Sequence, residues 1–140
     1  MEAIISRTFT PARLALVQQF LRFGAVGAIG FLVDTAVVYA LKGPAGLYVA
    51  GATSYVVAAT VNWGLNRVWT FRGRSSGRVH RQWALYLAAN GLGFVFNRGT
   101  FFILVTVSEL CRLYPVLAIA GGVAMGMFLN FHLARRFVFR

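Results

Sequence analysis

The chain has 140 residues, of which 59% are apolar, 15% aromatic and only 12% charged, with 14 Lys and Arg residues against 3 Asp and Glu. Soluble domains usually carry about 25% charged and about 45–50% apolar residues, so this composition excludes an ordinary soluble domain and predicts an integral membrane protein. The length allows about one domain, without room for a separate catalytic domain beside the membrane segments.

Four apolar stretches are long enough to cross a bilayer core of about 30 Å, which needs about 20 helical residues. We expect helices over residues 18–41, 47–66, 82–107 and 115–134, with turns at residues 42–46 and 109–115, where Gly and Pro interrupt the pattern. The basic start resembles a signal peptide, but no small-residue cleavage site follows it, so we expect the first helix to be retained. The sequence therefore predicts an all-α integral membrane fold, a bundle of four transmembrane helices.

The basic residues are distributed unevenly over the segments that connect these helices. Eleven fall in the N-terminal segment, the middle loop at about residues 72–82 and the C-terminal segment: Arg7, Arg13, Arg22, Arg67, Arg72, Arg74, Arg78, Arg81, Arg135, Arg136 and Arg140. The two hairpin turns hold only Lys42 and Arg112. By the positive-inside rule, both termini and the middle loop face the cytoplasm, which predicts a multi-pass protein of the inner (cytoplasmic) membrane. A net charge of +11 would suggest nucleic acid binding in a soluble protein, but here the membrane topology explains the positive charge. We therefore expect no nucleic acid partner.

The chain contains an internal repeat. Residues 62–72 align with residues 130–140, with five of eleven positions identical and two more exchanging one aromatic residue for another. Upstream, residues 20–41 align with residues 83–104, and the matched pairs are Phe23 with Tyr86, Gly30 with Gly93, Phe31 with Phe94, and Asp34 with Asn97. We therefore expect a single domain over residues 1–140 built from two tandem helical hairpins, at about residues 18–72 and 82–140, with the same orientation in the membrane.

These motifs resemble those of one membrane-protein family. The first helix carries the run FGAVGAIG at residues 23–30, followed by Asp34, and the run NRVWTFR occupies residues 66–72. Over about residues 20–140 this pattern is similar to the GtrA-like family, although Ala134 stands in the second repeat where the first has Asn66. The resemblance implies a role in cell-surface polysaccharide synthesis, in which polyprenyl-phosphate-linked sugars cross the cytoplasmic membrane, and a partner glycosyltransferase of the dolichol-phosphate-mannose type.

Asp34 and Arg98 are the two charged residues deep within the predicted spans. A charge at a helix centre costs about 2.5–3.5 kcal/mol on insertion scales, so such residues usually face a bundle interior and pair with one another. The simpler interpretation is an ion pair that holds the first helix against the third. The alternative leaves Arg98 as an anion site for a lipid phosphate that crosses the membrane.

Five asparagines form a second candidate set. These residues are Asn62, Asn66, Asn90, Asn97 and Asn130. For any one of them, hydrogen bonding between helices is the usual role. Together with Asp34 and Arg98 they also define a polar translocation seam that would solvate the hydroxyl groups of a sugar.

A third candidate set combines arginines and aromatic residues at the expected cytoplasmic face. The predicted lipid-phosphate ligands are Arg22, Arg67, Arg72, Arg135, Arg136 and Arg140, and the predicted interfacial aromatics are Trp63, Trp69, Phe71 and Phe137. Such residues commonly only anchor helices at the membrane surface. However, thirteen of the fourteen basic residues are arginine, whose planar guanidinium binds phosphate oxygens in a bidentate manner.

No pattern of catalytic or metal-ligating residues is recognisable. The sequence lacks a nucleophile–base set, a phosphate-binding Gly-rich loop with Lys, and paired carboxylates for a nucleotide-sugar metal, while His80 and His132 have no companion at metal spacing. Cys111 is the single cysteine, which excludes an internal disulfide. We therefore expect neither enzymatic activity nor a cofactor.

Small residues such as Gly24, Gly27 and Gly122 predict close helix packing, within the bundle or between two copies of a homodimer.

Three functional hypotheses remain open from the sequence. The first is translocation of a polyprenyl-phosphate-linked sugar lipid, with the path at or near a homodimer interface. The second is a non-transporting anchor that recruits a glycosyltransferase and presents the lipid substrate to it. The third is a proton-coupled exporter of cationic compounds that uses Asp34, against which Arg98 and the arginine-rich segments argue.

Overall fold

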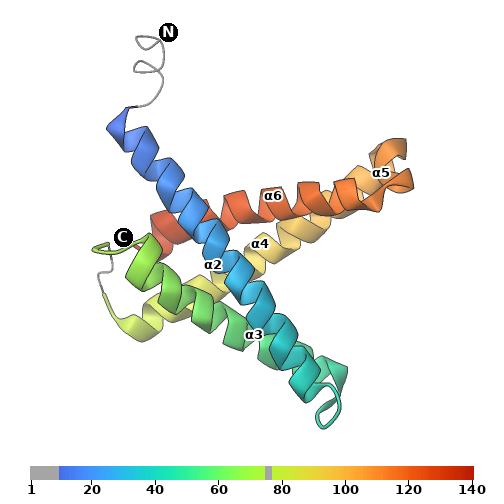
Figure 1. Ribbon diagram of the computed structural model, residues 1–140, viewed down its shortest axis with the longest axis horizontal. Helices are drawn as coiled ribbons and strands as arrows, with labels where there is room; N and C mark the ends of the chain where they lie inside the picture. Colours follow the sequence, from blue (N-terminus) through green and yellow to red (C-terminus); the bar gives the residue numbers. More distant parts are fainter. Residues whose placement is uncertain (1–9, 75–76) are drawn as a thin grey trace. The chain divides into compact units, whose positions relative to one another are not determined.

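The computed structural model describes residues 10–74 and 77–140, apart from the side chains of residues 47–48 and 115–116 (Figure 1). Every regular element within these residues is helical. The elements are α2 (Pro11–Leu41), α3 (Gly46–Leu65), the π-helix η1 (Asn66–Thr70), α4 (Val79–Val107), α5 (Glu109–Leu113), α6 (Pro115–Leu133) and the π-helix η2 (Ala134–Val138). Three segments of the described chain are long and apolar enough to cross a membrane: Pro11–Leu41, Val79–Val107 and Leu117–Val138. The predicted all-α membrane fold is therefore confirmed, and the count of four spans stays a prediction.

The helices match the predicted ones but differ at several ends. The first helix starts at Pro11 instead of residue 18, because Thr10 caps its N-terminus by accepting a hydrogen bond from the Arg13 N–H at 3.4 Å and Pro11 fits the first helical position. The second predicted turn holds the short helix α5, where the Ser108 hydroxyl accepts from the Cys111 N–H at 3.3 Å. The connection predicted at residues 109–115 is therefore present, but it contains a short helix instead of a simple turn, and α6 begins at Pro115.

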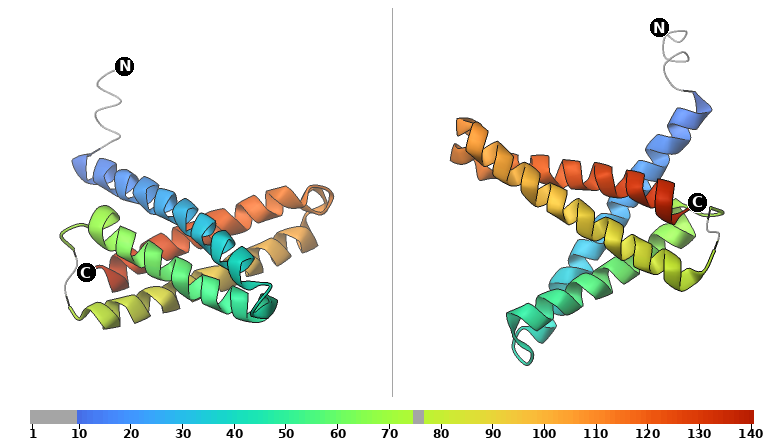
Figure 2. Two further views of the ribbon diagram at one scale, coloured as in Figure 1. Left: turned by 60° about the horizontal axis from the view of Figure 1, so that its bottom comes forward. Right: turned by 180° about the vertical axis from the view of Figure 1, so that it is seen from behind.

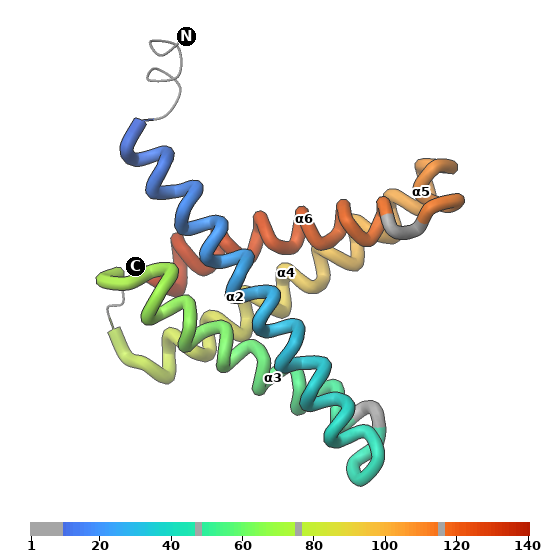
Figure 3. The backbone as a smooth tube through the Cα atoms, in the orientation of Figure 1, coloured from blue at the N-terminus to red at the C-terminus, as the bar shows by residue number. Residues whose placement is uncertain are grey.

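The chain forms two compact units, which we call unit 1 (Met1–Arg74) and unit 2 (Ser75–Arg140). Unit 1 pairs α2 with α3, and unit 2 pairs α4 with α6; in both views of Figure 2 the two helices of each pair lie side by side. Figure 3 follows each pair through its connection, which is a short turn after α2 and the helix α5 after α4. In both units a long first helix, of 31 and 29 residues, is followed by a shorter one of 20 and 19 residues.

Unit 1 is held together at one end by an aromatic contact. Phe23 on α2 and Phe71 after η1 meet edge to face, with ring centroids 6.2 Å apart, and both rings are buried. Edge-to-face geometry is a favourable arrangement of two aromatic quadrupoles. The Phe71 N–H donates to the Asn66 carbonyl at 2.8 Å, so the π-helical turn ends where the ring enters this contact.

Unit 2 repeats this contact with the aligned residues. Tyr86 on α4 and Phe139 after η2 also meet edge to face, with centroids 6.0 Å apart, and both are almost fully buried. The Phe139 N–H donates to the Ala134 carbonyl at 2.8 Å, as Phe71 does to Asn66 in unit 1. Since π-helices are rare and usually confined to a single turn, their presence at both repeat ends is a specific shared feature.

Candidate functional site

In unit 1, two arginines lie over tryptophan rings, of which Trp69 is exposed and Trp63 is half-buried. The Arg22 guanidinium carbon is 5.8 Å from the centre of the Trp69 ring, and that of Arg67 is 5.9 Å from the Trp63 ring. Both distances are within the range of a cation–π interaction, which orients the cation over the ring face. These predicted phosphate ligands are therefore associated with the aromatic residues predicted beside them. Phe71, predicted as an interfacial aromatic, is instead buried in the core of unit 1.

The C-terminal turn of unit 2 carries a similar cluster. The guanidinium carbons of Arg136 and Arg140 each lie 5.7 Å from the centre of the Phe137 ring, which is about half exposed. The Arg140 Nε–H also donates to the Arg136 carbonyl at 3.1 Å, so the Arg140 side chain folds back along η2. Arg135 is partly buried beside them on the same π-helix.

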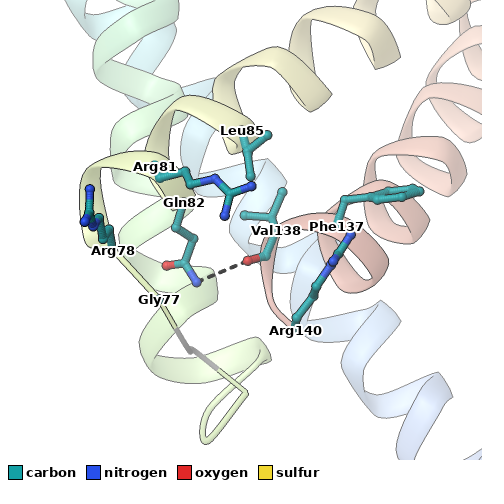
Figure 4. Close-up of a pocket in the computed structure, with 8 residues that line it drawn as sticks. All are labelled: Gly77, Arg78, Arg81, Gln82, Leu85, Phe137, Val138 and Arg140. Carbon is teal, nitrogen blue, oxygen red and sulfur yellow. Dashed lines mark hydrogen bonds between the residues drawn. The ribbon is translucent and has the colours of Figure 1, made fainter.

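Next to this cluster, unit 2 contains a cavity of about 320 Å³, which we call the arginine cavity. Its walls come from the start of α4 and from η2 and the residues that follow it, and are formed by Gly77, Arg78, Arg81, Gln82, Leu85, Phe137, Val138 and Arg140. Figure 4 shows the Arg81 side chain extending toward the Val138 segment, whereas Arg78 turns toward the outer side of α4. The buried Gln82 amide donates from Nε2 to the Val138 carbonyl at 3.2 Å and joins the two walls.

The predicted seam asparagines lie at helix contacts inside the units. In unit 1 the amide of Asn62 packs directly on Gly30, and in unit 2 the amide of Asn130 packs on the aligned Gly93. Gly30 and Gly93 have no side chain, and a Cβ added at either would collide with the amide. The side-chain oxygens of Asn62 and Asn130 are buried and have no hydrogen-bond partner among the described residues.

The remaining asparagines differ in their surroundings. Asn97 on α4 packs against α6, where a Cβ at Gly122 would lie 2.6 Å from the Asn97 carbonyl oxygen and one at Gly126 would lie 3.1 Å from the Asn97 Cβ. Asn90 donates from Nδ2 to the Tyr86 carbonyl of its own helix at 3.0 Å. Asn66 is buried at the start of η1.

Asp34 and Arg98 lie on different units. Asp34 is partly buried on α2, and Arg98 is exposed on α4, with its guanidinium carbon 5.5 Å from the centre of the Phe94 ring. An ion pair between them would be a contact between the two units, and it stays a prediction.

The sequence prediction missed three residues of the arginine cavity. Arg78 and Arg81 were used only to assign topology, and Gln82 was not considered. The sequence contained no clear signal for this grouping, because Arg78 and Arg81 precede the predicted start of the third helix at residue 82, whereas α4 in the structure already begins at Val79.

The sequence model of the GtrA/DPMS transmembrane domain matches residues 22–139, which covers helices of both units. The chain belongs to this family. The predicted resemblance to GtrA-like proteins is therefore confirmed. Membership of the GtrA/DPMS transmembrane domain family identifies a membrane domain, not catalytic on its own, and indicates involvement in the handling of polyprenyl-phosphate-linked sugars. No curated protein matches the chain.

Proposed function

We propose that this chain translocates a polyprenyl-phosphate-linked monosaccharide across the cytoplasmic membrane, for modification of a cell-surface polysaccharide or lipopolysaccharide. The observation that carries the proposal is the repetition of arginine–aromatic clusters at aligned ends of the two helical units of a GtrA/DPMS domain. Guanidinium groups oriented by neighbouring rings suit a phosphate at the membrane surface, because arginine binds phosphate oxygens with a fixed fork of donors.

The proposed topology has four spans with both termini in the cytoplasm. Three helical segments meet the length and hydropathy of a span, and α3 adds 20 residues, or about 30 Å at 1.5 Å per residue. The arginine–aromatic clusters of both units then lie at the inner leaflet, in agreement with the positive-inside rule.

In the proposed mechanism the polyprenyl chain stays in the lipid while the headgroup crosses along polar side chains. Arg22, Arg67, Arg72, Arg135, Arg136 and Arg140 collect the phosphate. The buried amide oxygens of Asn62 and Asn130 are acceptors for sugar hydroxyl groups in this mechanism. A buried acceptor without a donor costs about 1–3 kcal/mol, so a hydroxyl group that donates to either oxygen would recover part of this free energy. Arg98 is the anion site of the outer half.

Energy for outward movement comes from the membrane potential in this mechanism. An outward-moving monoanionic headgroup gains about 2.3 kcal/mol per 100 mV when the inside is negative, so no nucleotide is required. Since each unit is only a helix pair with its connections, we place the path at or near a homodimer interface.

A proteoliposome assay tests the proposal. The chain is reconstituted into vesicles that carry a fluorescent polyprenyl-phosphate sugar, and the fraction of lipid accessible to an external quencher is followed over time. We expect wild-type protein to move the lipid and Arg98→Ala to abolish movement, because the outer anion site is lost. Arg112→Ala, at an outer turn, is the matched control for charge removal. Wild-type rates equal to those of empty vesicles would contradict translocation.

The second candidate is a membrane anchor that recruits a polyprenyl-phosphate glycosyltransferase and presents its substrate. The arginine–aromatic clusters suit this function equally, since presentation also requires the phosphate to be held at the inner leaflet. An anchor has no use for Arg98. Under that function, Arg98→Ala would leave the activity of the co-reconstituted glycosyltransferase unchanged.

A further inference from the structure

The arginine cavity differs from the other arginine clusters because its arginines border a half-open pocket whose walls are partly polar and partly apolar. Three of its eight lining residues are arginines, and Gln82 is a polar side chain only 3% exposed. Its volume of about 320 Å³ lies at the low end of the about 300–1,000 Å³ typical of small-molecule sites. We propose that the arginine cavity is the site at which the chain binds the phosphate group of a polyprenyl phosphate lipid, with Arg81 and Arg140 as its principal ligands. This inference rests on the proposed function and assigns its phosphate to one unit.

The position of the cavity suits a headgroup whose tail stays in the membrane. One wall belongs to the first turns of the candidate span Val79–Val107, and the other to the last turn of the candidate span Leu117–Val138 and the residues after it. Both walls therefore lie at the ends of apolar helices, at the level where the hydrocarbon core meets the headgroup region. Leu85 and Phe137 supply apolar surface beside the arginines, against which the first carbons of a lipid chain can pack.

The walls are held in position by contacts that do not involve the arginines. Gln82 hydrogen bonds to the Val138 carbonyl at 3.2 Å, and Tyr86 packs edge to face on Phe139 one turn further along α4. Arg81 and Arg140 therefore project from two elements whose separation is already fixed. Only the exposed side chains of Arg81 and Arg140, and not the two backbone segments, then have to be ordered when an anion binds.

The charge of the cavity fits a phosphate. Its lining includes the three guanidinium groups of Arg78, Arg81 and Arg140, and no carboxylate side chain is among the lining residues. Hydrogen bonds between guanidinium and phosphate are charge-assisted and bidentate. The start of α4 adds the partial positive charge of a helix N-terminus on the same side.

Unit 1 lacks the residues that would make the same cavity. The alignment of the repeats places Gln19 opposite Gln82, but Ala15 and Gln18 stand where unit 2 has Arg78 and Arg81. Arg72 does stand opposite Arg140. The two units thus share the glutamine and the terminal arginine, whereas the two further arginines occur in unit 2 alone. This difference indicates a specific role for this end of unit 2.

The test measures lipid binding to the full chain in phosphatidylcholine nanodiscs by native mass spectrometry. The probes are a C55 polyprenyl phosphate, the neutral polyprenol of the same length, phosphatidylglycerol and sodium phosphate. We expect Arg81→Gln and Arg140→Gln each to weaken polyprenyl phosphate binding by about tenfold, because each removes a charged hydrogen-bond donor, and Arg78→Gln to weaken it less. Arg81→Lys, which keeps the charge but loses the fork, should bind with intermediate affinity.

Arg74→Gln is the matched control, because it removes the same charge from unit 1 outside the cavity and outside the proposed ligands. It should bind polyprenyl phosphate like the wild type. Unchanged binding of the neutral polyprenol by Arg81→Gln and Arg140→Gln shows that these variants are folded and have lost only recognition of the phosphate.

Several results would overturn the proposal, and each differs from failure of the proposed function. Equal binding of polyprenyl phosphate by Arg81→Gln, Arg140→Gln and the wild type would exclude the cavity, even if wild-type vesicles translocate lipid. Displacement by millimolar sodium phosphate would identify a site for free phosphate, and equally tight phosphatidylglycerol binding would identify a general anionic-lipid site. Conversely, cavity-dependent binding without transport in the vesicle assay would retain the site and reject translocation.

Discussion

Units 1 and 2 share their packing and differ in their polar residues. Each places a buried aromatic pair at one end, an asparagine amide on a glycine further along, and a π-helical turn after the second helix. Where unit 2 has Gly122 and Gly126 against Asn97, the alignment places Ser54 and Ala58 in unit 1, with Asp34 in place of Asn97. The two repeats therefore share these three features and differ both in the helix contact around Asn97 and in the residues of the arginine cavity. Comparing matched variants in the two units separates packing from function.

The largest effect is expected from the shared aromatic pair. Phe71→Ala and Phe139→Ala should each reduce the free energy of unfolding by about 3 kcal/mol, because each leaves a cavity beside a buried ring. Unfolding in mixed micelles, followed by circular dichroism, measures this change. Phe31→Ala is the control, since Phe31 is 69% exposed on α2 and should change stability little. A large loss in one unit and none in the other would show that the repeats are not equivalent in packing.

A smaller effect should distinguish the units at the α4–α6 contact. Gly122→Ala should reduce the free energy of unfolding by about 2 kcal/mol, because the added Cβ would lie 2.6 Å from the Asn97 carbonyl oxygen and the backbone would have to move. Gly99→Ala on α4 is the matched control, with no heavy atom within 4 Å of the added Cβ, and should be neutral or slightly stabilising. The same unfolding measurement applies. Equal stability of the two variants would mean that the close approach of α4 and α6 is not required.

The smallest effect concerns the asparagine–glycine contacts. Gly30→Ala and Gly93→Ala should each reduce the free energy of unfolding by about 1 kcal/mol, because only the side-chain amide of Asn62 or Asn130 has to move away from the added Cβ. If these amides also solvate a sugar, both variants should slow lipid movement in the vesicle assay more than this small loss of stability explains. Transport at the wild-type rate in both would assign the asparagines to packing alone.

Much of the fold was predictable because lipid imposes a simple rule of length and polarity. The apolar stretches located the four long helices, and the alignment of residues 62–72 with residues 130–140 identified positions that have matching contacts in the two units. The start of α2 was misplaced because the prediction followed the apolar stretch, whereas the helix extends further back to the cap formed by Thr10 and Pro11. The π-helical turns could not be predicted, since a single turn gives no measurable period.

The candidate site was only partly predictable. Association of Arg22 with Trp69 and of Arg140 with Phe137 follows from the expectation that arginines and aromatic residues share the interface. The arginine cavity depends on how the start of α4 packs against the chain after η2, which connects residues 56 positions apart through Gln82 and Val138. Charge counting along the sequence assigns Arg81 to a loop and contains no information on this contact.

The length of α2 has a mechanical consequence. Its 31 residues extend about 46 Å, whereas the hydrocarbon core is only about 30 Å thick. About ten residues therefore project beyond the core or are accommodated by tilt. Because the helix is continuous, a soluble protein that moved its first turns would displace Asp34 and the turn after α2 in the same motion. The helix would then act as a rigid rod that connects the aqueous phase with the interior of the membrane.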